Sequence, residues 1–207
     1  SASVIIPYNK LKFNPEDPAL GRGAFGEVKQ AMYEGTMVAV KQSVDGDYLS
    51  NNGYLELMRE ADLCSDLKHP NIVLFMGVVP KPLCIVLEKL DTCIHKMIHD
   101  EGRSFTEGEV CQVVDSVSQA LMHLHAKSII HRDVKPQNIL ANRSLHVVKV
   151  SDFGLSIVRE ESKAASGVTG TPVYAAPELW EELSYGPAAD VYSLAITTWE
   201  IVTGEVS

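Results

Sequence analysis

The sequence is short of cysteine and of positive charge, and each shortage argues against a class of protein. Its 207 residues include four cysteines, at positions 64, 84, 93 and 111, with no Cys-x-x-Cys pair. We therefore expect reduced thiols, packed as small apolar side chains in a reducing compartment. A net charge of −9, from 27 acids against 18 bases, argues against a surface for nucleic acid or anionic membrane.

Long apolar runs and repeats are missing as well. No stretch approaches the length that spans a bilayer, so we expect no membrane segment in this chain. Hydrophobic residues make up 45% and charged residues 22%, which is the balance of a globular protein. The length suits one large domain or two lobes around a cleft. The first residue is Ser1 and not Met, which indicates a piece of a longer protein or a tag.

Hydrophobic patterning predicts strands first and helices later. After an extended lead-in of twenty residues, we expect two strands within 20–41 and a strand pair over 72–79 and 83–87. Apolar residues at helical spacing predict a helix over 54–67. This order indicates an α+β fold with a strand-rich lobe over 1–87, a hinge over 88–92 and a helical lobe over 93–207.

A second helix has a clear start signal. Thr106 and Glu109 form a capping-box pattern ahead of a helix over 107–126, because each side chain can bond the other residue's backbone N–H. A third helix, over 190–203, is apolar nearly all round, and a helix of that kind is normally buried.

A charged turn within 130–140 carries the most chemistry. Asp133 is placed to accept a hydroxyl proton or to orient the attacking hydroxyl, and Lys135 can neutralise charge on a transferred phosphoryl group. Asn138 and Asp152 offer the hard oxygen ligands that Mg²⁺ prefers. The alternative is a surface turn with scattered charges.

Glycines are concentrated in Gly21-Arg22-Gly23-Ala24-Phe25-Gly26-Glu27-Val28. Gly21, Gly23 and Gly26 allow backbone N–H groups to approach phosphate oxygens without a Cβ in the way. A dinucleotide-binding fingerprint would need a helix directly after the third glycine, whereas 28–40 has the pattern of a strand. The dinucleotide interpretation therefore fails.

Lys41 ends an apolar strand and can be interpreted in two ways. Alone, it would be an ordinary lysine whose stem lies on apolar surface. Glu60 on the helix predicted over 54–67 offers a carboxylate partner, and a lysine held by a glutamate can present its charge to the α- and β-phosphates of a nucleotide.

With Ala176-Pro177-Glu178, these motifs resemble a eukaryotic protein kinase catalytic domain over almost all of 20–203. The resemblance implies a bilobal protein-kinase-like fold that binds ATP between the lobes, with Mg²⁺ (or Mn²⁺ in its place), and transfers the γ-phosphoryl group to a protein hydroxyl. It also implies a set of residues around the adenine, with Leu87 as gatekeeper and backbone groups from the hinge: Leu20, Val28, Ala39, Leu87, Glu88, Leu90 and Leu140.

Two features narrow the resemblance. Lys135-Pro136 and Gly170-Thr171-Pro172 are similar to serine/threonine kinases, while 69–77 and 83–88 are similar to the tyrosine-kinase-like group, such as Raf and mixed-lineage kinases. We expect a protein substrate with a Ser or Thr acceptor, Tyr as a further acceptor, and a role in intracellular signalling. The location expected is cytoplasmic, or the cytoplasmic side of a larger protein.

The resemblance also implies internal contacts. Asp190 would brace the backbone of the charged turn from below, and Thr171 would contact Asp133. Cys64, Phe75, His131 and Phe153 would stack as a column linking the lobes, which makes His131 structural. The other histidines show no zinc-type spacing with the cysteines, and we assign no role to His95, His99, His123, His125 and His146.

Regulation is predicted from charge. Arg132 is a cation beside the catalytic aspartate, and a phosphate on the following loop could pair with it and order that loop. Ser166 and Thr169 are favoured among the candidates Ser162, Ser166, Thr169 and Thr171. The alternative is a polar loop without a phosphorylation site.

The helix predicted over 190–203 raises a second functional hypothesis. In the family further helices cover it and supply an arginine to Glu178, whereas this sequence ends at Ser207. We therefore expect self-association through an uncovered face. The alternative function, for a truncated fragment, is a non-catalytic ATP-binding or scaffold module. A phosphotransferase acting on small molecules is disfavoured by the motifs around Thr171 and Glu178.

Overall fold

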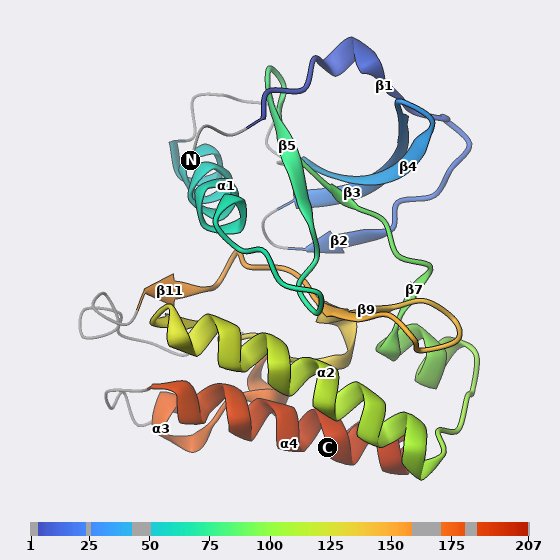
Figure 1. The fold of residues 1–207 in the computed structure, drawn as a ribbon, viewed down its shortest axis with the longest axis vertical. Coiled ribbons are helices and arrows are strands. Elements are labelled where there is room, and N and C mark those ends of the chain that lie inside the picture. The colour runs from blue at the N-terminus through green and yellow to red at the C-terminus, as the bar shows by residue number, and fades with distance from the viewer. Residues whose placement is uncertain (1–3, 24–25, 43–50, 159–170, 181–185, 207) are drawn as a thin grey trace. The chain divides into compact units, whose positions relative to one another are not determined.

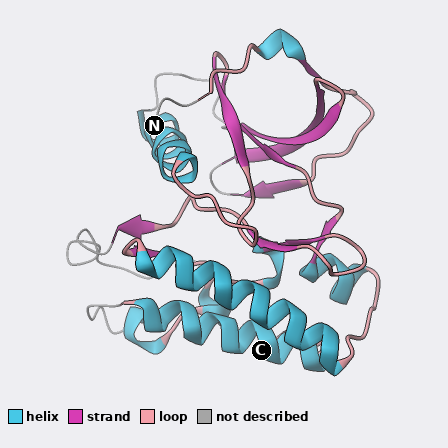
Figure 2. Cartoon of the chain, viewed as in Figure 1, coloured by secondary structure: helices cyan, strands magenta, loops and turns pink. Residues whose placement is uncertain are grey.

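The computed structural model describes residues 4–23, 26–42, 51–158, 171–180 and 186–206. It divides into two compact units, one of Ser1–Lys68 with Leu74–Lys89 and one of His69–Val73 with Leu90–Ser207. The first unit is mostly strand and the second mostly helix (Figure 2). His69–Val73 lies in the predicted strand-rich lobe but packs in the second unit, because the Val73 N–H donates to the Val150 carbonyl (3.0 Å).

A curled antiparallel sheet forms the body of the first unit (Figure 1). Its order is β1-β3-β4-β6-β5, with β2 paired to β3. The strands are β1 (Leu11–Lys12), β2 (Gly21–Gly23), β3 (Gly26–Tyr33), β4 (Thr36–Gln42), β5 (Phe75–Pro80) and β6 (Leu83–Glu88). Glu34 and Gly35 join β3 to β4 in a two-residue turn with φ of 48° and 85°, the hairpin geometry that matches strand twist.

The helix α1 (Asn51–Ser65) covers part of this sheet. Leu57 and Ala61 on the helix pack with Val78, Leu83 and Ile85 from β5 and β6, and all five are buried. The predicted helix over 54–67 and the predicted strand pair are therefore present, with the first strand beginning at Phe75 rather than at residue 72.

Residues 4–12 form more regular structure than the extended lead-in predicted from the prolines. Ile6 donates its N–H to the Val78 carbonyl (2.9 Å), and Val78 donates its own to the Val4 carbonyl (2.8 Å). A 3₁₀ turn, η1 (Tyr8–Lys10), and strand β1 follow. Ile6 is fully buried, so this segment contributes to the core of the sheet.

Helices α2 (Glu107–Ala126) and α4 (Pro187–Thr203) lie side by side in the second unit (Figure 1). The shorter elements around them are β7 (Thr92–Cys93), the π-helical turn η2 (Lys96–Asp100), β8 (Ile129–Ile130), η3 (Pro136–Asn138), β9 (Ile139–Ala141), β10 (Val148–Val150), β11 (Ile157–Val158), η4 (Pro172–Tyr174) and α3 (Pro177–Trp180). In the part of the chain that the structure describes, no helix combines the length and apolar composition needed to cross a membrane.

The capping-box prediction is confirmed. Glu109 donates its N–H to Thr106 Oγ1 (3.3 Å), and Thr106 donates its N–H to Glu109 Oε2 (2.9 Å). The helix that follows has the predicted bounds. At the other end of the chain, α4 is capped by Gly204 with φ of 74°, the left-handed conformation in which glycine carries no Cβ penalty.

We predict that Gly77→Ala destabilises the chain by about 1–3 kcal/mol, the usual cost of overpacking. A Cβ at Gly77 would lie 2.5 Å from the Val4 carbonyl oxygen and 2.9 Å from Ile6 Cδ1, so the amino-terminal segment would have to move. Urea unfolding measures the change. Gly108→Ala is the control, because a Cβ there meets nothing within 4 Å. Equal unfolding free energies for the Gly77 variant and the parent would contradict the prediction.

Candidate active site

The charged turn is held by the carboxylate of Asp190, which lies on α4 and is fully buried. Its Oδ2 accepts the N–H of His131 (2.9 Å) and its Oδ1 accepts the N–H of Arg132 (2.8 Å). His125 Nε2 on α2 lies 2.8 Å from Oδ2. Arg132 has φ of 67°, a costly conformation for a residue with a Cβ, and these bonds keep it there. The predicted brace is confirmed.

His131 is fully buried and uses both ring nitrogens to order the turn. Nδ1 accepts the N–H of Asp133 (3.2 Å), so Nε2 carries the proton and donates to the Ser151 carbonyl (3.0 Å). The ring meets Phe153 edge-on, with centroids 5.1 Å apart. These bonds leave no ring nitrogen for proton transfer to a substrate, in agreement with the predicted structural role.

The carboxylate of Asp133 is 6% exposed and has partners on both oxygens. Oδ2 lies 2.7 Å from Lys135 Nζ and accepts Asn138 Nδ2–H at 2.8 Å. Oδ1 accepts both the hydroxyl (3.1 Å) and the N–H (3.2 Å) of Thr171. The charge is therefore balanced by an ammonium group and by three neutral donors, as a buried carboxylate requires.

Thr171 places an aliphatic hydroxyl between a base and a cation. Its Oγ1 donates to Asp133 and at the same time accepts from Lys135 Nζ at 2.7 Å. Three residues from two segments of the chain, the charged turn and the start of η4, thus meet at one oxygen atom. The arrangement can polarise a hydroxyl and receive its proton.

A β-hairpin brings the two predicted metal ligands together. Strands β9 and β10 pair with Ile139 opposite Val150, so Ser151 donates both its N–H (2.9 Å) and its hydroxyl (3.0 Å) to the Asn138 carbonyl. Asp152 follows directly, with φ of 63°. Asn138 Nδ2 donates to the Asp133 carboxylate, so Asn138 Oδ1 points away from that carboxylate. The donor set, one amide oxygen and one carboxylate, fits a hard divalent cation.

Lys41 and Glu60 form a buried ion pair in the first unit. Lys41 Nζ lies 2.8 Å and 2.7 Å from the two carboxylate oxygens, and the side chains are only 9% and 4% exposed. The pair joins β4 to α1. Breaking such a pair by removing one partner is costly because it leaves an uncompensated buried charge.

The predicted nucleotide-contacting residues fall in both units. Leu20 donates its N–H to the Val28 carbonyl (2.8 Å), which closes the β2–β3 pair around the glycines, and Ala39 lies opposite Leu87 in the β4–β6 register. The first unit contains Leu20, Gly21, Gly23, Gly26, Val28, Ala39, Leu87 and Glu88; the second contains Leu90 and Leu140.

Comparison with known proteins decides the family. A profile of the protein kinase domain matches residues 15–207. The chain belongs to the protein kinase domain family. The family prediction is therefore confirmed, together with the α+β fold of a strand-rich first part and a helical second part.

Curated relatives of this kinase domain carry serine/threonine kinase names. The chain is 39% identical over 189 residues to "Probable serine/threonine-protein kinase drkD" of Dictyostelium discoideum, covering 89% of the chain and 14% of the relative. It is 35% identical over 206 residues to "Serine/threonine-protein kinase CTR1" of Arabidopsis thaliana, covering 96% and 24%. It is 36% identical over 190 residues to "Probable serine/threonine-protein kinase SIS8" of Arabidopsis thaliana, covering 89% of the chain and 18% of the relative. The chain thus spans a quarter or less of the length of these three relatives.

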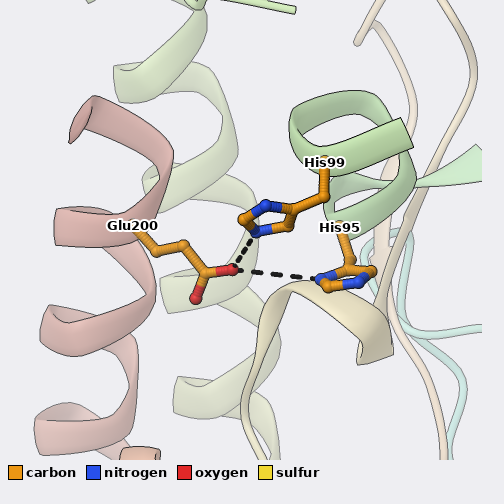
Figure 3. A group of neighbouring side chains, drawn as sticks. All are labelled: His95, His99 and Glu200. Carbon is orange, nitrogen blue, oxygen red and sulfur yellow. Dashed lines mark hydrogen bonds and ion pairs between the residues drawn. The ribbon is translucent and has the colours of Figure 1, made fainter. Parts of the chain in front are cut away.

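Sequence reasoning missed one cluster in the kinase domain. Glu200 on α4 is fully buried; its Oε1 lies 2.7 Å from His99 Nε2 and 3.9 Å from His95 Nδ1 (Figure 3), and its Oε2 accepts the Tyr174 hydroxyl at 2.5 Å. Burial, and then the bond to Glu200, raises the pKa of Tyr174 far above its usual value. The sequence does carry one signal for this cluster, because His95 and His99 are four residues apart and would share one side of a helical turn. The search for metal sites compared the histidines only with the cysteines, so it did not find this pair.

The predicted phosphorylation sites lie mostly outside the described residues. Ser162, Ser166 and Thr169 fall there, so their phosphorylation stays a prediction. Arg132, their predicted partner, donates from Nε to the Leu155 carbonyl at 2.6 Å. Thr171 is described and bonds Asp133 and Lys135.

We predict that Asp190→Asn lowers the free energy of unfolding by about 2–3 kcal/mol, since hydrogen bonds to a charged group contribute about 1.5–3 kcal/mol each. The amide keeps one acceptor oxygen and turns an NH₂ group toward a backbone N–H. Chemical denaturation followed by circular dichroism measures the change. Asp115→Asn, an exposed change of the same type on α2, is the control and should shift stability by no more than about 0.5 kcal/mol. Matching shifts in the two variants would refute the role given to Asp190.

Proposed function

We propose that the chain transfers the γ-phosphoryl group of ATP to serine and threonine hydroxyls of protein substrates. The observation that carries the proposal is the arrangement of Asp133, Lys135 and Thr171. A hydroxyl of the acceptor's own chemical class already donates to Asp133 Oδ1 and accepts from Lys135 Nζ. A substrate hydroxyl needs the same two partners.

The chemistry follows from those partners. The substrate oxygen attacks the γ-phosphorus, the bond from that phosphorus to the β–γ bridging oxygen breaks, and ADP leaves with the bonding electrons. Asp133 accepts the hydroxyl proton, while the ammonium of Lys135 offsets negative charge on the phosphoryl oxygens. Lys135 lies 2.7 Å from Asp133 Oδ2, so proton acceptor and counter-charge are held as one unit.

Asn138 and Asp152 are the residues that would hold the divalent cation, Mg²⁺ or Mn²⁺ in its place. Two protein oxygens suffice, because Mg²⁺ keeps several waters and takes nucleotide phosphates as its other ligands. The cation supplies neutralisation of phosphate charge. Asn138 also donates to the Asp133 carboxylate (2.8 Å), which links the metal ligand to the base.

Lys41 serves the nucleotide in this proposal. Both carboxylate oxygens of Glu60 contact its ammonium group, which limits the rotamers available to Lys41 and keeps the charge in place for the α- and β-phosphates. The glycines at 21, 23 and 26 offer backbone N–H groups to the phosphates, and the side chains of Leu20, Val28 and Ala39 contact the adenine ring.

The relatives support the acceptor class. The three relatives named above are called serine/threonine-protein kinases, in two cases with "probable", and Lys135-Pro136 indicates the same acceptor class. Tyrosine as a further acceptor, a role in intracellular signalling and a cytoplasmic location belong to the proposal as well.

The test compares the parent chain with Asp133→Asn, using radiolabelled ATP, Mg²⁺ and a generic protein substrate. Loss of the proton acceptor should reduce phosphate incorporation about 10²- to 10⁴-fold, with nucleotide affinity little changed. Asp115→Asn, an exposed change of the same type, should keep the parent rate. If the parent binds ATP but parent and Asp133→Asn incorporate equal phosphate, the chain is the non-catalytic ATP-binding or scaffold module.

We also propose that two copies associate through one face of α4. Val191 (59% exposed), Tyr192 (41%), Trp199 (41%) and Val202 (66%) share that face, whereas the opposite side of the helix packs inward. A contiguous apolar face of this kind favours a protein contact.

Sedimentation velocity tests the association. Val202→Glu should shift the chain toward monomer at concentrations where the parent is dimeric, and Leu55→Glu, at an exposed leucine of the first unit, should not. A parent chain that stays monomeric throughout the concentration range would disprove the contact.

A further inference from the structure

Three side chains outside the proposed catalytic turn converge on one point in the second unit. His95 and His99 come from the helical turn at η2, and Glu200 comes from α4, about a hundred residues later (Figure 3). One donor atom from each lies within 4.8 Å of the other two. Neither phosphoryl transfer nor nucleotide binding uses any of them.

We propose that these three side chains form a binding site for a divalent transition metal ion of the Zn²⁺ class. Two imidazole nitrogens and one carboxylate oxygen are a ligand set that zinc takes in proteins, with a water molecule in the fourth position. Imidazole is a poor ligand for Mg²⁺, which prefers oxygen, so the site differs in kind from Asn138 and Asp152.

The local backbone places the two histidines on one side. His95 and His99 are four residues apart in a helical turn that ends in π-helical form, with the Glu101 N–H donating to the Lys96 carbonyl (3.0 Å). Their ring centroids are 4.5 Å apart. Histidines at this spacing on a helical face can bind one metal ion together.

The donor separations suit a tetrahedral ion after small adjustments. Zinc bonds of about 2.0–2.2 Å put neighbouring tetrahedral ligands roughly 3.3–3.6 Å apart. Glu200 Oε1 is 2.7 Å from His99 Nε2 and 3.9 Å from His95 Nδ1, so the two distances lie on either side of that range. Side-chain movements of roughly half an ångström would bring both distances into this range.

Outer contacts fix the carboxylate. Glu200 is fully buried, and its second oxygen accepts the Tyr174 hydroxyl at 2.5 Å. That bond directs Oε1 toward the two imidazoles. Hydrogen bonds of this kind to ligating carboxylates orient them and strengthen metal binding.

Gln137 gives an independent indication of a missing partner. Its Nε2 lies 2.9 Å from His95 Nδ1, while its Oε1 is buried and has no hydrogen-bond partner among the described residues. A metal ion at Nδ1 displaces the amide N–H. Rotation of the amide then turns Oε1 toward the ion or its water, which gives the unpartnered oxygen a partner.

A metal ion bound here would affect the proposed active site through two residues that are close to it in the sequence. Tyr174 lies three residues after Thr171, and Gln137 precedes Asn138. A bound ion would join η2 to α4 and would hold Gln137, within the charged turn, and Tyr174 in place. We therefore expect it to stabilise the chain thermally.

Titration calorimetry of the metal-free chain with ZnCl₂, without nucleotide, tests the site. We expect one ion per chain, a rise in Tm, and no competition from Mg²⁺. Co²⁺ should give the intense visible absorption of a four-coordinate ion. His95→Ala, whose side chain is 32% exposed and can be lost without opening the core, should weaken binding at least tenfold. Glu200→Gln should do the same, and Tyr174→Phe should weaken it about 10- to 100-fold.

His146→Ala is the matched control, because His146 is exposed and outside the cluster. It should keep the parent affinity. Circular dichroism establishes that each variant is folded, and His95→Ala and Tyr174→Phe keep the test valid if Glu200→Gln unfolds. Parent-like zinc affinity in folded His95→Ala would overturn the proposal, as would an equal loss in His146→Ala. In either case the cluster is an ion-free hydrogen-bonded link between η2 and α4.

Discussion

The buried carboxylate of Asp190 is the contact on which the charged turn depends. A carboxylate without water is costly unless its oxygens are hydrogen-bonded, and here two backbone N–H groups and His125 serve it. These bonds have two effects. They satisfy the charge, and they hold Arg132 in a left-handed conformation that would otherwise relax.

The rest of the turn follows as a chain of contacts. With its backbone fixed by Asp190, His131 reaches the Ser151 carbonyl on one side and the Asp133 N–H on the other. Ser151 in turn bonds Asn138, and Asn138 bonds Asp133. The Asp133 carboxylate is therefore oriented by backbone and side-chain bonds that need no substrate. In the first unit, Lys41 on β4 and Glu60 on α1 form a buried ion pair.

The features that could be predicted from sequence are those with local signals. Thr106 and Glu109 are three residues apart, and the helix they start has the predicted bounds. The acid, lysine and asparagine of the turn could be recognised because their chemistry is concentrated in a few residues. The cluster around Glu200 could not be found this way, since its bonds span 101 residues to His99 and 26 to Tyr174. The partners of Glu200 are determined by how α4 packs, and no local sequence pattern predicts that packing. The brace by Asp190 was foreseen only from the family resemblance.

Residues before position 15, where the family profile begins, are part of the folded sheet. The protein kinase profile begins at residue 15, yet Val4 and Ile6 bond Val78 on β5, and Ile6 is fully buried. Strand β5 is last in the sheet order, so this segment satisfies backbone groups that an outermost strand leaves open. A chain shortened to residue 15 would expose an unpaired, apolar edge at β5. The paired part of the sheet therefore begins before the residue at which the family profile begins.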